Sequence, residues 1–381
     1  MRLTIWKEGC TPTAWPQVSS RFQSRSIAVL ATPGSTHMTE LRRFADIRCV
    51  VFGSYVADCA IQTATLPSWD DDIRAQSIVI NPGGKAANQA VALARMGAQV
   101  SAVGVIGGDA VGADIMDHLR SNQVDTSGVY VKPTSATPVC LVFNGQRGKK
   151  SITWSIAEEL QVSVKQAQES EVLIAEADVI ILTFELPLTT ISSILQAAHK
   201  YQKKVVLNAA PCRSAIETAD ANFSGVTALV VNEREAHTLF GYSKQLPDEF
   251  ADMSTFAGRH GIDLVCVTRG AAGCSYWYAG QLNHHPGLPV AVQDSVGAGD
   301  AFVATLALYQ AAGYEPATAI RGACTAGGLA AESPGALSSM PTHQQLRRRL
   351  AEWSHLGSGS VEIGVEPAQE LDTPIGYSRV A

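Results

Sequence analysis

The stretch Asp294-Ser-Val-Gly-Ala-Gly-Asp300 leads into an apolar run, and together they predict a helix over residues 298–313. Gly297 and Gly299 allow sharp backbone turns, so consecutive N–H groups can point the same way where the helix begins. Free amides and the helix dipole at such an end favour an anion, most naturally a phosphate. Asp300 lies in the first turn beside this anion site, although a carboxylate there can also act only as a helix cap.

A second pair of glycines opens another predicted helix, in Asn81-Pro-Gly-Gly-Lys-Ala-Ala-Asn-Gln89. Gly83 and Gly84 allow the backbone to approach a ligand closely, and Lys85 and Asn88 place polar groups at the same end of the helix. Taken alone, a lysine at such a place is commonly solvated and an asparagine is commonly a cap. The sequence contains no G-x-x-x-x-G-K-[ST] motif, so a P-loop nucleotide site is excluded.

Apolar runs that predict buried strands alternate with helical patterns through the middle of the chain. The predicted strands cover residues 48–53, 179–183, 204–208, 227–231 and 264–267, and the predicted helices cover 84–97, 188–201, 233–240, 298–313 and 316–331. Since each strand is apolar on both faces, the pattern indicates an α/β fold with a mostly parallel sheet between helices. The segments 60–82 and 138–155 break this rhythm, and 138–155 predicts a hairpin in a small antiparallel element.

The net charge is −6, from 29 Lys and Arg against 35 Asp and Glu. A chain with this balance has no global electrostatic reason to bind nucleic acid or an anionic membrane, although backbone amides can still bind phosphate locally. Hydrophobic residues make up 46% of the 381 residues, which is enough for a sizeable core. No apolar run approaches the ~20 residues of a membrane-spanning helix, so no membrane partner is expected.

The eight cysteines are scattered without a C-x-x-C pair, which disfavours a zinc site and predicts reduced thiols in a cytoplasmic protein. Residues 1–39 are poor in acids and rich in Ser and Thr, as in a transit peptide, so import into an organelle is an alternative. A disordered or spurious extension over residues 1–47 is the other interpretation of this composition. Residues 351–381 are expected to form a flexible tail.

Two long segments resemble the two signatures of the ribokinase family of sugar kinases, also called the phosphofructokinase-B family. They are DSVGAGDAF at residues 294–302 and GGKAANQAVALARMG at residues 83–97. Shorter segments follow in the order and spacing of the family: Gly53-Ser-Tyr-Val-Ala-Asp58, Glu185-Leu-Pro187, Asn208-Ala-Ala-Pro211, Val231-Asn-Glu-Arg-Glu235 and Val267-Thr-Arg-Gly-Ala-Ala-Gly273. The resemblance covers roughly residues 48–350, nearly all of the segment expected to be globular.

The resemblance implies a ribokinase-like three-layer α/β/α sandwich over residues 48–350, with a small antiparallel β-lid from segments near 58–82 and 138–155. It also implies a homodimer through that lid. The implied activity is transfer of the γ-phosphate of ATP to a sugar hydroxyl, with D-ribose to D-ribose 5-phosphate as the leading assignment. Asp300 matches the catalytic base of the family, and the amides from Val296 to Gly299, with Gly297 and Ala298 between them, match its anion hole.

The resemblance also implies binding roles for individual positions. The sugar-binding positions are Asp58, Gly84, Lys85, Asn88, Glu185 and Asp300. The nucleotide-binding positions are Asn232, Thr268, Gly270, Gly273, Gly299 and Cys324. For metals, Glu235 matches a position that holds Mg²⁺ through water, and Asp294, Val296, Gly335 and Ser339 match a monovalent-cation site that takes K⁺. Each role has a structural alternative: Asp58 as a turn cap, Glu235 as a solvated helix acid, and Cys324 as a core residue.

The chain departs from the family pattern near the sugar. Val56 stands where ribokinases usually carry Asn, so one hydrogen bond to the sugar is missing. The segment 156–160 also replaces a Gly-Ala-Asn type segment of many relatives. A nucleoside, or another small sugar such as fructose or 2-keto-3-deoxygluconate, therefore stays open as the acceptor. A non-catalytic sugar or nucleotide sensor is a further alternative, which the intact Asp300 and Gly297-Ala-Gly299 disfavour.

Overall fold

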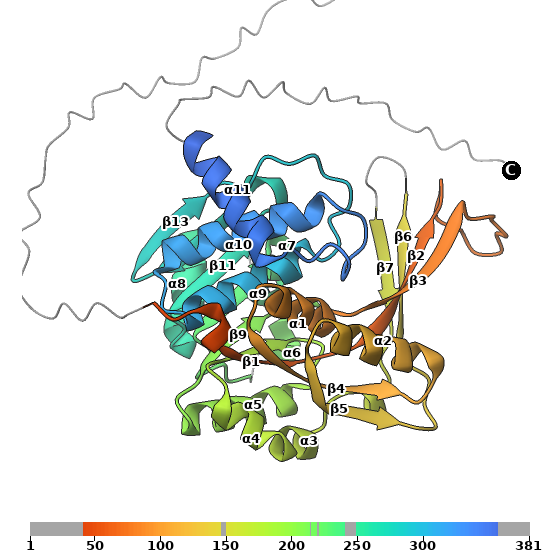
Figure 1. Cartoon of the computed structure of the whole chain (residues 1–381), viewed down its shortest axis with the longest axis horizontal. Helices are drawn as coiled ribbons and strands as arrows, with labels where there is room; N and C mark the ends of the chain where they lie inside the picture. Colours follow the sequence, from red (N-terminus) through yellow and green to blue (C-terminus); the bar gives the residue numbers. More distant parts are fainter. Residues whose placement is uncertain (1–40, 146–149, 214, 219–220, 241–248, 357–381) are drawn as a thin grey trace, which may run out of the picture. The chain divides into compact units, whose positions relative to one another are not determined.

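The computed structural model describes residues 41–356, apart from residues 146–149, 214, 219–220 and 241–248. At the centre of this described part is a sheet of nine strands in the order β13-β12-β11-β10-β9-β8-β1-β4-β5 (Figure 1). Neighbouring strands from β11 to β5 are parallel, whereas β12 and β13 are antiparallel at one edge. The strands are β1 (Arg48–Phe52), β4 (Gln99–Gly107), β5 (Asp125–Lys132), β8 (Val179–Thr183), β9 (Lys204–Asn208), β10 (Ala228–Asn232), β11 (Leu264–Thr268), β12 (Cys274–Tyr278) and β13 (Gln281–His285).

Successive side chains of a central strand enter two different hydrophobic cores. In β1, Cys49 and Val51 are buried in one core, and Val50 and Phe52 are buried in the other. Because a strand points its side chains alternately to its two faces, burial of both faces requires an unbroken apolar run. The predicted α/β/α layering is therefore confirmed by the division of the core.

The helices divide between the same two cores. One face of the sheet packs against α1 (Lys85–Arg95), α2 (Ala110–Ser121), α9 (Ala298–Ala311), α10 (Pro316–Ala331) and α11 (His343–Leu356). The other face packs against α3 (Val164–Glu169), α4 (Glu171–Glu176), α5 (Leu188–Lys200), α7 (Glu233–Phe240) and α8 (Glu249–His260). A single turn, α6, spans Ala215–Thr218.

A second, smaller sheet has the strand order β3-β2-β6-β7 and stands beside the main sheet (Figure 1). Its strands are β2 (Val56–Gln62), β3 (Ser77–Gly83), β6 (Val139–Asn144) and β7 (Lys150–Trp154). The β2–β3 and β6–β7 pairs are antiparallel, as predicted, but the central β2–β6 pair is parallel. The predicted lid is thus mostly antiparallel, because two hairpins from distant parts of the chain join through strands that run the same way.

The ordered structure extends past both predicted boundaries of the kinase domain. At the start, Phe44 is buried, and its ring lies 5.2 Å from that of Tyr309 between ring centroids. At the end, α11 continues through residue 350 to Leu356, and Arg349 forms a 2.9 Å ion pair with Glu332. Described secondary structure thus begins before residue 48 and ends after residue 350. The predicted extension up to residue 40 and the tail from residue 357 lie outside the described residues.

The cysteines and the possible membrane spans can be compared with the sequence predictions in the described part of the chain. Seven of the cysteines are free thiols there, and Cys10 lies outside it. None of the helices in the described ranges is long and apolar enough to cross a membrane.

Candidate active site

Polar residues stand in a row where the parallel strands of the main sheet end. Thr183 and Asn208 are register partners at the ends of β8 and β9, and Asn232 and Thr268 are partners at the ends of β10 and β11. Glu185 follows β8 by two residues. Ligands of open α/β sheets bind at this edge, because loops and helix N-termini meet there. In the strand order, Glu185 after β8, which is predicted to bind the sugar, therefore lies at one end of the row. Asn232 and Thr268 at the ends of β10 and β11, which are predicted to bind the nucleotide, lie at the other end.

Two glycines shape the start of α9 in different ways. Gly297 has a φ of +81°, and a Cβ there would lie 2.6 Å from the Cε of Met340, so the turn itself needs glycine. At Gly299 a Cβ would meet no atom of the described chain within 4 Å. The Cα of Gly299 therefore faces open space at the start of the helix, as the predicted anion hole requires.

Asp300 is 9% exposed and receives two hydrogen bonds from α1. Asn88 donates from Nδ2 to Oδ2 at 2.9 Å, and Gln89 donates from Nε2 to Oδ1 at 3.0 Å. The structure thus brings together the two segments that carry the long motifs. The contact of Gln89 was not predicted, because its partner lies 211 residues away in the sequence.

The second motif joins the small sheet to α1. Gly83 ends β3, and a side chain there would overlap the carboxylate of Asp58 on the paired strand β2. Gly84 has a φ of +96°, and a Cβ there would lie 2.5 Å from the carbonyl oxygen of Ser54. Both glycines are therefore required by close packing, and they bring Asp58 to the N-terminal end of α1, next to Lys85.

Four carboxyl groups surround the Lys85 ammonium closely enough to affect titration: Asp58, Glu185, Glu235 and Asp300. Burial raises the pKa of Asp58 to about 6 and that of Glu185 to about 7. Burial likewise raises the pKa of Asp300 and of Glu235. It would lower the pKa of Lys85, but the surrounding carboxylates outweigh burial and raise that pKa. The site is therefore an acidic cluster with one central cation.

Asn232 and Glu235 form a reciprocal pair at the start of α7. The backbone N–H of Asn232 donates to Oε2 of Glu235 at 2.8 Å, and the backbone N–H of Glu235 donates to Oδ1 of Asn232 at 2.8 Å. This arrangement caps the helix, so the segment has a structural role besides the predicted one. The carboxylate of Glu235 is 9% exposed and close enough to Lys85 for the two charges to interact.

The predicted nucleotide loop follows β11. Gly273 has a φ of +93°, and a side chain there would overlap the carbonyl of His285, so the turn requires glycine. Gly270 has a φ of +53°, and a Cβ there would meet no described atom within 4 Å. Thr268 donates its hydroxyl to the carbonyl oxygen of Val231 at 3.3 Å.

Cys324 is 7% exposed and lies in α10, within the same core as Cys274. Cys274 is the register partner of Thr268, so Cys324 packs beneath the predicted nucleotide loop. Burial raises the pKa of Cys324 well above its usual range. The thiol is therefore neutral and behaves like a small apolar side chain. Packing in the core is enough to explain why a cysteine is buried at this position.

The residues predicted to bind a monovalent cation meet around Asp294. Its Oδ1 accepts the N–H of Val296 at 3.0 Å, and its Oδ2 accepts the N–H of Gly335 at 3.1 Å. Ser339 lies four residues after Gly335 and donates its hydroxyl to a carbonyl of the same loop. The Nζ of Lys150, from β7 of the small sheet, lies 3.0 Å from Oδ1. Asp294 thus supplies the anionic oxygens of the predicted cation site, and in this structure they accept two backbone N–H groups and pair with an ammonium ion.

Two side chains near the site were not predicted to be there. Lys150 comes from the hairpin of the lid and could not be linked to Asp294, 144 residues away, from sequence patterns. Cys140 is the register partner of Asp58 across β2 and β6, and burial followed by the charge of Asp58 raises its pKa to about 11. The parallel pairing that puts Cys140 there was also absent from the sequence prediction.

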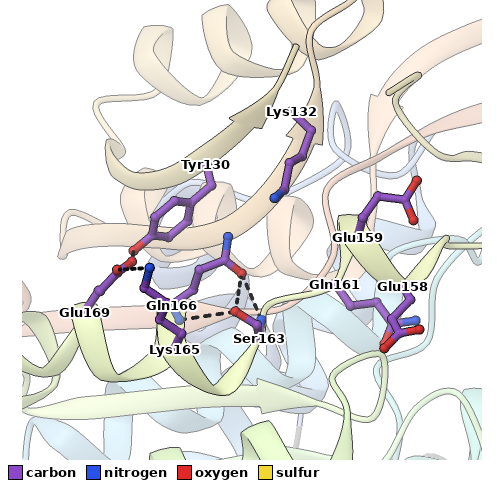
Figure 2. Close-up of a pocket in the computed structure, with 9 residues that line it drawn as sticks. All are labelled: Tyr130, Lys132, Glu158, Glu159, Gln161, Ser163, Lys165, Gln166 and Glu169. Carbon is purple, nitrogen blue, oxygen red and sulfur yellow. Dashed lines mark hydrogen bonds and ion pairs between the residues drawn. The ribbon is translucent and has the colours of Figure 1, made fainter. Parts of the chain in front are cut away.

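A pocket of about 320 Å³ lies elsewhere, beside the C-terminal half of β5. Figure 2 shows that several of its lining side chains bond to one another, as when the hydroxyl of Tyr130 donates to Glu169 at 3.0 Å. Its other lining residues are Lys132, Glu158, Glu159, Gln161, Ser163, Lys165 and Gln166. None of the predicted site residues lines this pocket, so it is separate from the candidate active site.

The sequence profile described as "pfkB family carbohydrate kinase" matches residues 46–343. This chain belongs to that family. The ribokinase of Bacillus subtilis is 31% identical to it, over 80% of this chain and 99% of that protein. The ribokinase of Haemophilus influenzae is 30% identical, over 77% of this chain and 95% of that protein. This carbohydrate kinase is therefore a phosphotransferase that acts on a sugar hydroxyl.

Solved structures show the same fold as this carbohydrate kinase. Arabidopsis thaliana ribokinase, solved with ribose and ATP, superposes with a TM-score of 0.69 at 25% identity, over 80% of this chain and 98% of its own. Giardia lamblia ribokinase superposes with a TM-score of 0.71 at 21% identity, over 81% of this chain and 99% of its own. Because the Giardia protein is only 21% identical, this superposition supports the fold alone.

Proposed function

We propose that this carbohydrate kinase transfers the γ-phosphoryl group of ATP to the 5-hydroxyl of D-ribose and releases ADP and D-ribose 5-phosphate. The observation that carries the proposal is the position of Asp300, which is buried at the start of α9 and tied to Asn88 of α1 at 2.9 Å. The relatives add support, because those with about 30% identity are ribokinases. The Arabidopsis structure was solved with both ribose and ATP.

Asp300 acts as the general base in this proposal. Its carboxylate accepts the proton of the sugar hydroxyl while the hydroxyl oxygen attacks the γ-phosphorus, and ADP leaves from the opposite side. The base must be ionised, and the nearby Lys85 ammonium favours its charged form against the effect of burial. Phosphoryl transfer depends mainly on positioning and charge stabilisation, and a carboxylate fixed between two helices supplies the positioning.

Backbone amides at the start of α9 stabilise charge on the transferred phosphoryl group. Within Val296 to Gly299, the N–H of Val296 donates to Asp294 and that of Ala298 to Ser295, which leaves those of Gly297 and Gly299 for the anion. They lie where α9 begins, so the helix dipole adds to their effect. The open space beside Gly299 gives an anion room to approach the backbone. The small sheet excludes water when it covers the site, which limits the loss of ATP by hydrolysis.

The sugar lies among Asp58, Lys85, Asn88 and Glu185. A carboxylate such as Asp58 can accept hydrogen bonds from two neighbouring hydroxyls, and the Oδ1 of Asn88 is a buried acceptor without a partner in the described chain. Val56 is 6% exposed and apolar, so it offers the sugar no hydrogen bond. The acceptor could therefore differ from ribose, and a nucleoside or another small sugar is the second candidate.

Two metal ions belong to the proposal. Glu235, with Asn232 beside it, would hold Mg²⁺ through water, because a buried carboxylate facing a polar site suits a hydrated cation. Asp294 and its loop, with Val296, Gly335 and Ser339, would hold K⁺. When bound, the ions neutralise charge on the polyphosphate and stiffen the loop that precedes the anion hole. Neither site is a cluster of protein ligands, because the described ranges contain no group of three or more His, Cys, Asp or Glu side chains that could hold a metal.

A panel of acceptors tests the proposal. ATP consumption is measured with ribose, fructose, 2-keto-3-deoxygluconate, adenosine and pseudouridine, and Asp300→Asn is the control that lacks the proposed base. We expect ribose to give the highest kcat/KM and the control to be inactive with every acceptor. Turnover of a nucleoside without turnover of ribose would reject the assignment of the substrate, and activity of the control equal to wild type would reject Asp300 as the base.

A further inference from the structure

Gln89 is a fully buried side chain of α1 that donates a hydrogen bond to Asp300. It is 0% exposed, and its Nε2 donates to Oδ1 of Asp300 at 3.0 Å. Asn88 donates to the other oxygen, Oδ2, at 2.9 Å. With one donor on each oxygen, the carboxylate cannot rotate about its Cβ–Cγ bond without losing both hydrogen bonds.

The other end of the Gln89 amide has no partner. Its Oε1 is buried and accepts no hydrogen bond from any described residue. A buried acceptor without a donor is unfavourable, so an apolar side chain of similar size would suit this position better for packing alone. The Gln89 amide therefore contributes through its Nε2 donor, which binds Asp300, and not through its carbonyl oxygen.

We infer that Gln89 is a positioning residue for the proton-accepting carboxylate of Asp300, which it orients from the interior of the protein. Because Gln89 has no exposed surface, it cannot touch the sugar or ATP, and any effect on turnover passes through Asp300. The inference rests on the proposed function, in which Asp300 is the base. Asn88 differs, since its own carbonyl is free to accept a sugar hydroxyl.

A second consequence concerns protonation. Burial raises the pKa of Asp300, while Lys85, Asn88 and Gln89 favour the ionised form and lower it. Removal of the Gln89 donor should therefore raise the pKa of Asp300 further. Since the base works only when it is ionised, the acidic limb of the kcat profile should move to higher pH.

Gln89→Met tests the inference, because Met has a similar size and no donor. We expect kcat to fall by roughly 10- to 100-fold while the KM values for sugar and ATP stay within about threefold, with the acidic limb shifted to higher pH. Gln310→Met is the matched control: Gln310 also has a buried carbonyl without a partner in the described chain, but it lies near the other end of α9. This control should keep wild-type kcat and pH dependence.

A measurement without turnover separates this inference from the proposed function. The titration of Asp300 is followed by ¹³C NMR of carboxyl-labelled protein, with Asp300→Asn to assign the signal. A higher pKa in Gln89→Met supports the inference even if wild type phosphorylates none of the acceptors tested, an outcome that would reject the proposed function. An unchanged pKa with unchanged kcat would overturn it. Failure of both Gln89→Met and Gln89→Leu to fold would also overturn it, by assigning Gln89 to structure alone.

Discussion

Lys85 and the four carboxyl groups around it are the most unusual feature at the scale of single residues. Burial raises the pKa of Asp58 to about 6 and that of Glu185 to about 7. The ionised form of each carboxyl group is therefore less favourable in the folded protein than in water. A carboxylate is nonetheless the better acceptor for sugar hydroxyls. The site thus keeps charges that cost folding stability because the ligand requires them.

Glu185→Gln should reveal this cost as a gain in stability at alkaline pH. A carboxyl whose folded pKa is about 7, against an ordinary value of 4.5, binds protons more tightly when folded, so stability falls as pH rises between these values. The variant removes this penalty and should be more stable than wild type at pH 8, by on the order of 2 kcal/mol, and equal to it near pH 4. Urea unfolding at both pH values measures the difference. A variant less stable than wild type at pH 8 would contradict the charge balance described for the site.

Gly299→Ala should separate folding from anion binding. The added methyl meets no described atom within 4 Å, and alanine is favoured over glycine inside a helix, so the unfolding temperature should stay equal or rise slightly. The methyl would enter the open space where the proposal places the phosphoryl group, so kcat/KM should fall by roughly 10²-fold or more. Gly297→Ala is the comparison, since its φ of +81° and the contact with Met340 predict a lower unfolding temperature. Normal turnover of Gly299→Ala would place the phosphoryl group elsewhere.

At the scale of elements, the ion pair of Lys150 and Asp294 links the small sheet to the loop before α9. The two side chains are 22% and 21% exposed, and their atoms lie 3.0 Å apart. Burial alone would raise the pKa of Asp294, but the hydrogen bonds from Val296, Lys150 and Gly335 prevail and lower it. A mobile cation at Asp294 must therefore compete with an ammonium ion that belongs to the chain.

Lys150→Met should make the protein more responsive to K⁺. Without the ammonium, Asp294 binds the free ion with less competition, so adding K⁺ in place of tetramethylammonium should raise the unfolding temperature by roughly 1–3 °C more than in wild type. Lys165→Met, which removes another lysine that pairs with an acid, is the control and should respond like wild type. Equal responses of Lys150→Met and wild type would show that Lys150 does not compete with the ion.

The sequence predicts the elements well where local patterns decide them. The unbroken apolar runs locate β1, β8, β9, β10 and β11, and the glycine pairs locate the starts of α1 and α9 within a few residues. These features depend on backbone conformation and on burial of both strand faces, both of which are local. The long motifs also point to Lys85, Asn88 and Asp300, and the shorter segment that ends at Asp58 points to that residue; the structure does bring the four together.

Contacts between distant segments could not be predicted in the same way. The parallel pairing of β2 with β6, the bond from Gln89 to Asp300 and the ion pair from Lys150 to Asp294 join positions that no sequence pattern links.

At the scale of the whole molecule, the small sheet carries exposed apolar side chains that a lone lid would not need. Ile78 and Ile80 are 62% and 59% exposed and lie on the face of the sheet opposite to Asp58, whereas the exposed Ile152 and Trp154 share the face of Asp58. Apolar groups concentrated on one element are typical of a surface that meets another protein, and a second copy of this lid is the proposed partner. Sedimentation equilibrium should show a dimer at micromolar concentration, and Ile80→Asp should shift it to monomer. A monomeric wild type would contradict the proposed dimer.

The negative charge of the whole chain is compatible with ATP binding at the proposed site. A protein with a net charge of −6 can bind a polyanion if the phosphates meet backbone amides at the start of α9 and a single lysine, rather than a basic surface. In the proposal, Gly297 and Gly299 of the 32 glycines serve this purpose. The others named above keep the turns that bring the strands and helices to the site.

The central claim is that Asp300 takes the proton of a sugar hydroxyl as the hydroxyl oxygen attacks ATP. The most direct test is the transfer of label from [γ-³²P]ATP to ribose by wild type and by Asp300→Asn, with ATP affinity measured by calorimetry in both. We predict labelled ribose 5-phosphate from wild type, and a kcat lower by about 10²- to 10⁴-fold in the variant with ATP affinity unchanged. Label transfer by Asp300→Asn at the wild-type rate would contradict the account.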